Sequence, residues 1–225
     1  MKKSLIKKIF IKLSKFVGYE IIDQNEFYSP TLNKELDQKL SSISKSIILP
    51  MGEVNLSRKI KSLLIIFRTN TNVEIWDQNR KRLFEKPKIE YVLRSLYSLI
   101  KSIKKLNSEN KDIEIKLKII DDNSNEENLK KIKNLLKISS LNFEIISHSF
   151  NDHKNYIKKQ KSLETFANLS SLLKSFEIGK TEGKDLVLFV EDDYLHFESA
   201  LEEMIATYER IASQLNRDIF MCPSD

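Results

Sequence analysis

The residues best suited to chemistry in this sequence are three consecutive carboxylates, Glu191, Asp192 and Asp193. They follow a run of apolar residues, 186–190, that shows no polar alternation and is typical of a strand buried on both faces. Acids crowded at the end of such a strand repel one another and lose hydration, and a divalent cation is the usual compensation. Glu191 and Asp193 are expected to approach one ion, because residues two apart share a side of an extended chain. The alternative is a solvated acidic loop in which Asp192 or Asp193 caps the next helix.

Two other polar clusters follow apolar runs in the same way. One run ends at Arg68 and Thr69, and another ends at Asp121 and Asp122. The carboxyl ends of parallel strands meet at one edge of a sheet, and open α/β folds bind ligands along that edge. All three clusters are therefore expected at one site. For Asp121 and Asp122, a helix-capping turn is the alternative explanation.

Strand and helix patterns alternate from residue 62 onward. Short apolar runs of strand type are separated by segments whose apolar residues recur at helical spacing. The expected strands cover residues 63–67, 113–120, 143–146, 186–190 and 219–222, and the apolar faces of the expected helices cover 88–106, 129–136, 163–176 and 201–215. This alternation predicts an α/β fold, a mostly parallel sheet flanked by helices on both faces.

Local signals predict where these helices begin and end. Ser124 and Glu127 have the spacing of a capping box, and so have Ser199 and Glu202 before the last helix. Gly179 follows the apolar face of the third helix and is expected to end it.

The N-terminal segment, residues 1–17, differs from the rest of the chain in charge. It holds six lysines and no acid, and its apolar residues recur at helical spacing: Ile6, Ile9, Phe10, Leu13, Phe16 and Val17. Such a helix, ended by Gly18, can lie in an anionic membrane interface. The alternative is a helix packed on its own domain or on a partner. Lysines interrupt the apolar part and no small-residue cleavage site follows, so it is not a signal peptide.

The chain is expected to have two parts. Residues 1–60 form the basic helix and a linker or extension, which includes a short helix over 32–48. Residues 61–225 form one domain that is expected to be truncated at its C-terminus. The single cysteine, Cys222, excludes an intrachain disulfide and favours a reducing compartment. A cytoplasmic location follows, with the inner face of a membrane as the place for the basic helix.

The composition excludes several classes of site. The sequence has only four glycines, and neither a Gly-x-Gly-x-x-Gly dinucleotide motif nor a P-loop can be written from them. Three scattered histidines and one cysteine argue against a structural zinc site. Despite the net charge of +6, the lysines beyond the N-terminal segment are spread among glutamates, which argues against a nucleic-acid face.

Taken together, the strand ends resemble those of glycosyltransferases with the GT-A fold, in particular the large family 2 group. The resemblance covers residues 62–225. One strand ends in Asp121, Asp122, Asn123 and Ser124, which fits the family's Asp-Asp-x-Ser pattern. The acidic triplet stands where the family has an Asp-x-Asp type motif, with Glu191 in place of the usual first aspartate. The resemblance implies a GT-A, Rossmann-like domain that binds a nucleotide-sugar, most simply a UDP-sugar.

The same resemblance implies roles for individual residues. Thr69 and Arg68 would lie near the base, Asp122 would accept a hydrogen bond from the base or ribose, and Asp192 would face the ribose. A Mn²⁺ or Mg²⁺ ion would stabilise the departing diphosphate. The implied nucleotide-binding residues are Arg68, Thr69, Asp121, Asp122 and Asp192, and the implied metal ligands are Asp193 and Glu191.

The resemblance implies transfer of a sugar to an acceptor such as a glycan or a lipid-linked saccharide. It identifies no catalytic base, because the family's base lies further along the chain. One alternative is a non-catalytic nucleotide- or partner-binding domain that lacks the acceptor half. Another is a phosphorylation receiver domain, which also pairs acids after a strand. Residues 143–146 end at Ser147 and His148 and do not supply the phospho-acceptor aspartate of that class.

Overall fold

A computed structural model covers the 225 residues, and it describes residues 5–17, 45–48, 52–72, 86–157 and 163–222. The chain divides into two compact units. One comprises Met1–Arg58 with Tyr208–Ser224, and the other comprises Lys59–Thr207. The second unit contains the sheet with the polar strand ends, and the expectation that residues 61–225 form a nucleotide-sugar-binding domain stays a prediction.

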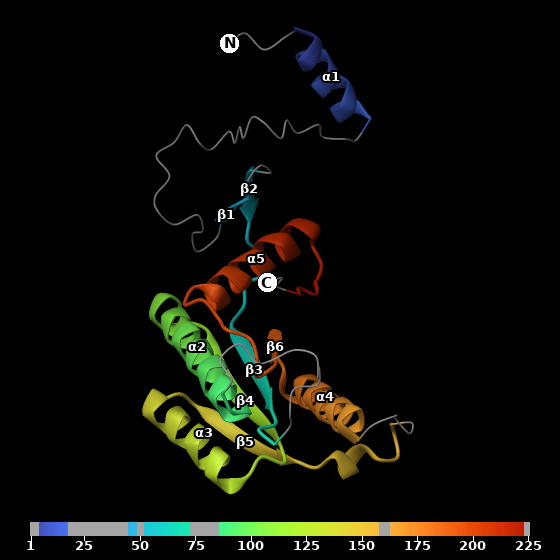
Figure 1. The fold of residues 1–225 in the computed structure, drawn as a ribbon. Helices are drawn as coiled ribbons and strands as arrows, with labels where there is room; N and C mark the ends of the chain where they lie inside the picture. The colour runs from blue at the N-terminus through green and yellow to red at the C-terminus, as the bar shows by residue number, and fades with distance from the viewer. Residues whose placement is uncertain (1–4, 18–44, 49–51, 73–85, 158–162, 223–225) are drawn as a thin grey trace. The chain divides into compact units, whose positions relative to one another are not determined.

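The second unit is built on a four-stranded parallel sheet (Figure 1). Its strands are β3 (Ser62–Thr69), β4 (Glu114–Asp122), β5 (Phe143–His148) and β6 (Leu186–Val190), in the order β5-β4-β3-β6. The predicted α/β fold is confirmed, because every neighbouring pair in this sheet is parallel. β3 and β6 pair from Leu63 opposite Leu186 to Phe67 opposite Val190, so the two apolar runs belong to one sheet.

Helices cover both faces of this sheet, as predicted. α2 (Lys88–Glu109) and α3 (Glu126–Ser139) pack together on one side in Figure 1, and α4 (Leu163–Glu182) packs on β3 and β4 from the other. A short 3-10 helix, η1 (Phe150–His153), precedes α4. The side chains that fill the core come mainly from β3, β4 and one face of α2, and include Ile65, Ile66, Phe67, Leu96, Leu99, Ile119 and Ile120.

The position of β6 differs from the prediction of a strand buried on both faces. Among the described strands β6 pairs only with β3, so it is an edge strand. Leu186, Val187 and Leu188 are half-buried, and Phe189 is 40% exposed. Phe189 packs edge-on against Phe176 of α4, with ring centroids 5.1 Å apart. An apolar sequence indicates that a strand can be buried, but the elements that pack beside it determine how much of its surface is buried.

The predicted helix boundaries need two corrections. Asn125, not Ser124, caps α3, because its side chain accepts a hydrogen bond from the Asn128 N–H at 2.8 Å. Before the last helix, α5 (Ala200–Leu215), the Ser199 hydroxyl donates to Glu203 at 2.7 Å, and the capping box of Ser199 with Glu202 stays a prediction. Gly179 does not end its helix.

Instead, α4 continues past Gly179 to Glu182. A Cβ atom at Gly179 would lie 3.0 Å from Phe189 Cζ and 3.3 Å from Val187 Cγ1. The glycine therefore allows the helix to approach β6 closely, which is a packing role and not a terminating one.

The first unit contains α1 (Leu5–Phe16), which confirms the predicted N-terminal helix, and an antiparallel hairpin of β1 (Lys45–Ile48) and β2 (Gly52–Asn55). The helix expected over 32–48 is wrong at residues 45–48, where cross-strand pairing produces β1, and residues 32–44 lie outside the described part, as does Gly18. Residues 219–222 form no strand, because they lack a hydrogen-bonded neighbouring strand among the described residues. Arg58 joins the two segments of this unit by an ion pair with Asp218 at 2.5 Å.

Candidate functional site

The strand order places a topological switch point between β3 and β6. From β3 the chain adds β4 and then β5 on one side, and it returns to add β6 on the other side. Open α/β sheets bind ligands outside the carboxyl ends of strands at such a point. The carboxyl ends of β3 and β6 lead into Thr69 and Asp192, so two of the predicted clusters lie at the switch point itself.

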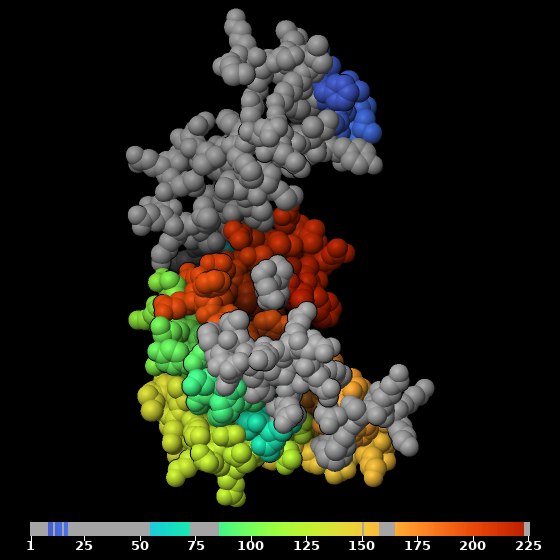
Figure 2. All heavy atoms as spheres, viewed as in Figure 1, coloured from blue at the N-terminus to red at the C-terminus, as the bar shows by residue number. Residues whose placement is uncertain are grey.

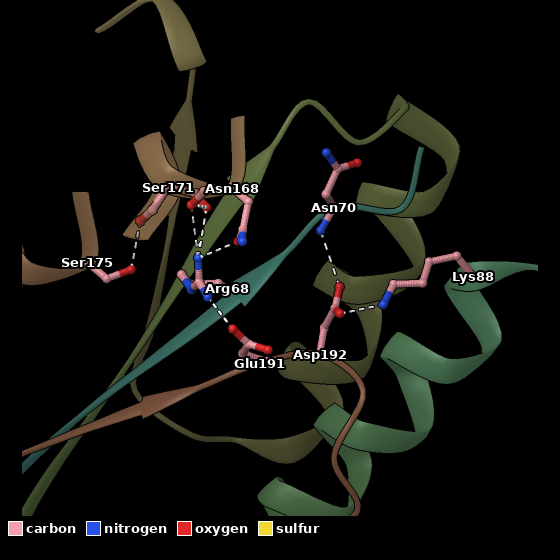
Figure 3. Close-up of polar contacts among 8 residues, drawn as sticks. All are labelled: Arg68, Asn70, Lys88, Asn168, Ser171, Ser175, Glu191 and Asp192. Carbon is pink, nitrogen blue, oxygen red and sulfur yellow. Dashed lines mark hydrogen bonds and ion pairs between the residues drawn. The ribbon is translucent and has the colours of Figure 1, made fainter. Parts of the chain in front are cut away.

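Asp192 is the centre of the contacts on one side of this edge. Its Oδ2 accepts hydrogen bonds from the Thr69 hydroxyl at 2.9 Å and from the Asn70 N–H at 3.2 Å. Its Oδ1 pairs with Nζ of Lys88, the first residue of α2, at 2.6 Å (Figure 3). Asp192 is only 8% exposed, so these three donors compensate the burial of its charge.

Arg68 has a separate set of partners on α4. Its Nη1 donates to Asn168 Oδ1 and to Ser171 Oγ, both at 3.1 Å, and its Nη2 pairs with Glu191 (Figure 3). Successive side chains of a strand point to opposite faces, so Arg68 is directed to α4 while Thr69 is directed to Asp192. The sequence predicts Arg68 and Thr69 together beside a base. The structure separates their contacts, and the base-binding role of either residue stays a prediction.

Asp121 and Asp122 end β4 and are both buried. Asp121 Oδ2 accepts the Ser124 N–H at 3.2 Å, and its Oδ1 has no hydrogen-bond partner among the described residues. Burial raises the pKa of Asp121, and the hydrogen bonds from Ser124 and the charge of Lys133 oppose the rise. The same Ser124 explains the corrected cap, because its hydroxyl accepts the Thr71 N–H at 3.0 Å and thereby ties β4 to the segment after β3.

The pKa of Asp122 reports its surroundings at this edge. Burial raises that pKa first, and the charge of Asp121 raises it further. A hydrogen bond with the Asn70 side chain and the charge of Arg68 lower it. Asn70 donates its N–H to Asp192, and its side chain is among the groups that lower the pKa of Asp122. The structure brings the ends of β3, β4 and β6 together as predicted, through one residue that the prediction did not include.

Asp193 is the most weakly paired member of the triplet. The chain leaves the strand at Val190 and turns at Asp192 and Asp193, so the extended alternation expected for Glu191 and Asp193 does not continue to the end of the triplet. Asp193 is exposed, yet loss of hydration raises the pKa of its carboxyl, and the charges of Asp192 and Glu191 add to the rise. The charge of Lys88 opposes it.

Lys88 is not among the predicted site residues, although it pairs with Asp192. A signal was present, because a helix that follows a strand of a parallel sheet begins near the edge where that strand ends, and Lys88 is the first residue of the helix after β3. Asn70 had no comparable sequence signal. Its hydrogen bond to Asp192 comes from the main-chain N–H, which every residue except proline has.

Among the described residues the site has more acidic than basic side chains. It contains five carboxylates (Asp121, Asp122, Glu191, Asp192 and Asp193), two cations that pair with them (Arg68 and Lys88) and Lys133, whose charge acts on Asp121. Among the described residues no group of three or more His, Cys, Asp or Glu side chains is arranged to hold a metal ion. Mg²⁺ in nucleotide sites is nevertheless bound by one or two carboxylates together with phosphate oxygens and water. Oxygen ligands with excess negative charge fit such an ion.

A second buried polar cluster lies at the opposite edge of the sheet, near β5 and α4. Ser170 Oγ lies 3.0 Å from His148 Nε2 and 3.0 Å from His153 Nδ1, and His153 Nε2 lies 3.1 Å from Glu177. Burial lowers the pKa of His148, and the charge of Asp152 partly opposes this. Because Ser170 is fully buried, the cluster joins η1 to α4 and does not present a nucleophile to solvent.

No family model matches this sequence, and no curated protein matches it significantly. The chain is similar to two solved structures of the galactosyltransferase LgtC. One is an active-site mutant, with 16% sequence identity and a TM-score of 0.30, and the other is a complex with donor and acceptor sugar analogues, with 19% identity and a TM-score of 0.31. Each match covers 58% of this chain, and the chain spans only 37% of the length of LgtC. Similarity at this level indicates no particular glycosyltransferase family and assigns no function.

Proposed function

We propose that the unit Lys59–Thr207 is the donor-binding part of a glycosyltransferase and binds the nucleotide portion of a sugar nucleotide at the carboxyl ends of β3, β4 and β6. One observation carries the proposal. Asp192 of the acidic triplet is hydrogen-bonded to Thr69 and Asn70 at the end of β3, and Thr69 lies opposite Asp121 of β4 in the sheet. Three polar clusters that are distant in sequence thereby lie together at a topological switch point.

The geometry of Asp192 suits recognition of a ribose. An ionised carboxylate offers about four acceptor positions. Thr69, Asn70 and Lys88 occupy three of them, which leaves a fixed acceptor for a hydroxyl group. Asp122 supplies a second acceptor for the base or ribose. Because its neighbours already hold Asp192 in place, binding a hydroxyl requires little reorientation of that side chain.

The charge balance supports a divalent cation at the site. Among the described residues five carboxylates outnumber the cations beside them, so a diphosphate would be repelled, and a bound Mg²⁺ or Mn²⁺ ion would offset that repulsion. Asp193 would hold the ion together with Glu191, which would exchange its contact with Arg68 for the metal. When bound, the ion would act as a Lewis acid that stabilises the diphosphate leaving group. Arg68 and Lys88 remain as the protein's own positive charges beside the phosphates.

We propose a glycan or lipid-linked saccharide as the acceptor and UDP as the nucleotide of the donor. No general base is assigned. Binding of the nucleotide without turnover is the outcome that would identify the chain as a non-catalytic nucleotide-binding domain.

Calorimetry of the full chain with UDP and with GDP, each with and without Mn²⁺, tests the site. We expect Mn²⁺ to raise the affinity of the wild-type protein, and Asp193→Asn to abolish that dependence with an unchanged circular dichroism spectrum. Glu198→Gln is the matched control, because Glu198 is an exposed acid five residues further on that pairs with Lys101. Equal binding by wild type and Asp193→Asn, with or without metal, would show that the site assignment is wrong.

Release of nucleoside diphosphate from UDP-, GDP- and dTDP-sugars separates the enzyme from the binding domain. A positioned general base contributes about 10²–10⁴-fold to such a reaction. We expect this chain alone to show slow release that depends on the metal and on Asp193. Binding with no release at all would leave the nucleotide-binding function and remove the catalytic one.

A further inference from the structure

Helix α1 presents an apolar face to solvent. Its spacing is that of an amphipathic helix, which in a globular domain normally buries its apolar stripe. The exposed fractions of its apolar side chains and of the residue that follows are large (Figure 2, blue), at 52% for Ile9, 67% for Phe10, 63% for Leu13, 94% for Phe16 and 63% for Val17. An apolar face with these exposed fractions is suited to contact with an external surface.

The charge of the segment identifies the kind of surface. Residues 1–17 include six lysines and no acidic residue, whereas lysines elsewhere are interspersed with acids. A protein groove that receives an amphipathic helix requires only an apolar face. Six lysines without neighbouring acids favour a negatively charged surface, and the apolar face requires an apolar one. An anionic lipid bilayer provides both, because its headgroups are negatively charged and its acyl chains are apolar.

The length of the helix indicates its orientation in a bilayer. α1 has 12 residues, which corresponds to a helix about 18 Å long at 1.5 Å per residue. The hydrocarbon core of a bilayer is about 30 Å thick. No helix in the described part of the chain combines the length and the hydropathy that a membrane span requires. α1 therefore fits in the plane of the interface, with Phe10 and Phe16 entering the acyl region and the lysines at the headgroups.

We propose that α1 is a membrane-surface helix that binds bilayers containing anionic lipid. Binding requires both faces of the helix, the apolar side chains for insertion and the lysines for attraction to the headgroups. It is independent of the donor site, so it stands or falls without the proposed glycosyltransferase function. Membrane binding would also bring the chain to a lipid-linked acceptor at the inner face of a membrane, and this second point rests on the proposed function.

The test is sedimentation of the full chain with vesicles of phosphatidylcholine alone or with 30% phosphatidylglycerol. The charge variant replaces Lys7, Lys8, Lys12 and Lys15 by glutamine, which has a similar helix propensity. The matched control makes the same replacement at four lysines outside α1, Lys104, Lys111, Lys154 and Lys180, which are exposed and equal in total charge. The charge variant is expected to lose roughly 100-fold or more in partitioning to anionic vesicles. The control is expected to bind like wild type.

A second variant, Phe10→Ala with Phe16→Ala, tests insertion. It keeps every lysine and should also lose binding, including at low salt where charge attraction is strongest. Circular dichroism and calorimetric unfolding of each variant show whether the rest of the chain remains folded. Equal sedimentation of wild type and the charge variant would overturn the proposal. So would an equal loss in the lysine control, or equal binding to neutral and anionic vesicles. Absence of binding by the wild-type chain would instead favour a helix that docks on a partner protein.

Discussion

Asp192 differs from the other acids of the site in the number of donors that hold it. Thr69 and Asn70 donate to one of its oxygens, and Lys88 pairs with the other. By contrast, Glu191 forms an ion pair with Arg68 alone among the described residues, and Asp193 is exposed. When a buried carboxylate loses a charged partner, the free-energy cost of its desolvation remains but the attraction that offset this cost is gone. The Lys88–Asp192 pair is therefore expected to matter for stability as well as for binding.

Lys88→Met tests this at the level of a single residue. The substitution keeps the length of the side chain and removes its charge, which leaves Asp192 with two neutral donors. We expect a loss of about 1–3 kcal/mol in the free energy of unfolding, measured by urea denaturation. Lys101→Met is the control, because the pair of Lys101 with Glu198 is exposed and its loss should leave the unfolding midpoint unchanged. An equal effect of the two substitutions would mean that the Lys88 contact is only a surface ion pair.

At the scale of elements, the position of β6 depends on its contact with α4. The two glycines near the end of this helix, Gly179 and Gly183, both face β6. Phe189 and Val187 occupy the space that their missing side chains leave, which compensates in part for the open edge of the strand. Close packing of a helix on an edge strand positions the acidic triplet that follows it.

Gly183→Ala is the test of this packing. A Cβ at residue 183 would lie 2.4 Å from the Gly179 carbonyl oxygen and 2.4 Å from Val187 Cγ2, so the helix end or the strand must shift. We expect destabilisation by about 1–3 kcal/mol from overpacking, read from thermal and urea unfolding. Gly179→Ala is the comparison. Its new methyl group meets the tip of the partly exposed Phe189 ring, which can move, and it gains helix propensity of about 1 kcal/mol. Destabilisation by Gly179→Ala that equals or exceeds that by Gly183→Ala would contradict this account.

At the scale of the whole molecule, stability is expected to be highest in the middle of the parallel sheet. β3 is paired on both sides and buried over most of its length, and β4 is paired on both sides as well. β5 and β6 each pair on one side among the described strands. Regions with fewer buried contacts open at a lower free energy than the core.

Hydrogen exchange measures this difference residue by residue. The amides of β3 and β4 that pair within the sheet should exchange slowest, at rates set by global unfolding. Those of β6 should exchange faster, although its sequence is as apolar as that of β3. Protection of β6 equal to that of β3 in the isolated chain would show that a further element covers its outer edge.

The sequence by itself determined the elements of the sheet, their parallel α/β arrangement and the polar residues at three strand ends. These features are local, because an apolar run, a helical spacing and an acid after a strand are each encoded in a few neighbouring residues. The amphipathic character and charge of the N-terminal helix were determined in the same way.

Only the tertiary structure decided which of these residues meet. Strand order assigned β6 to an edge, and the pleat of β3 directed Arg68 to α4 and Thr69 to Asp192. Lys88, the first residue of α2, then pairs with Asp192, and only the packing of α2 beside the end of β6 specified that contact. Contacts of this kind join residues separated by up to 123 positions, and they depend on how elements pack, which short-range residue preferences do not specify.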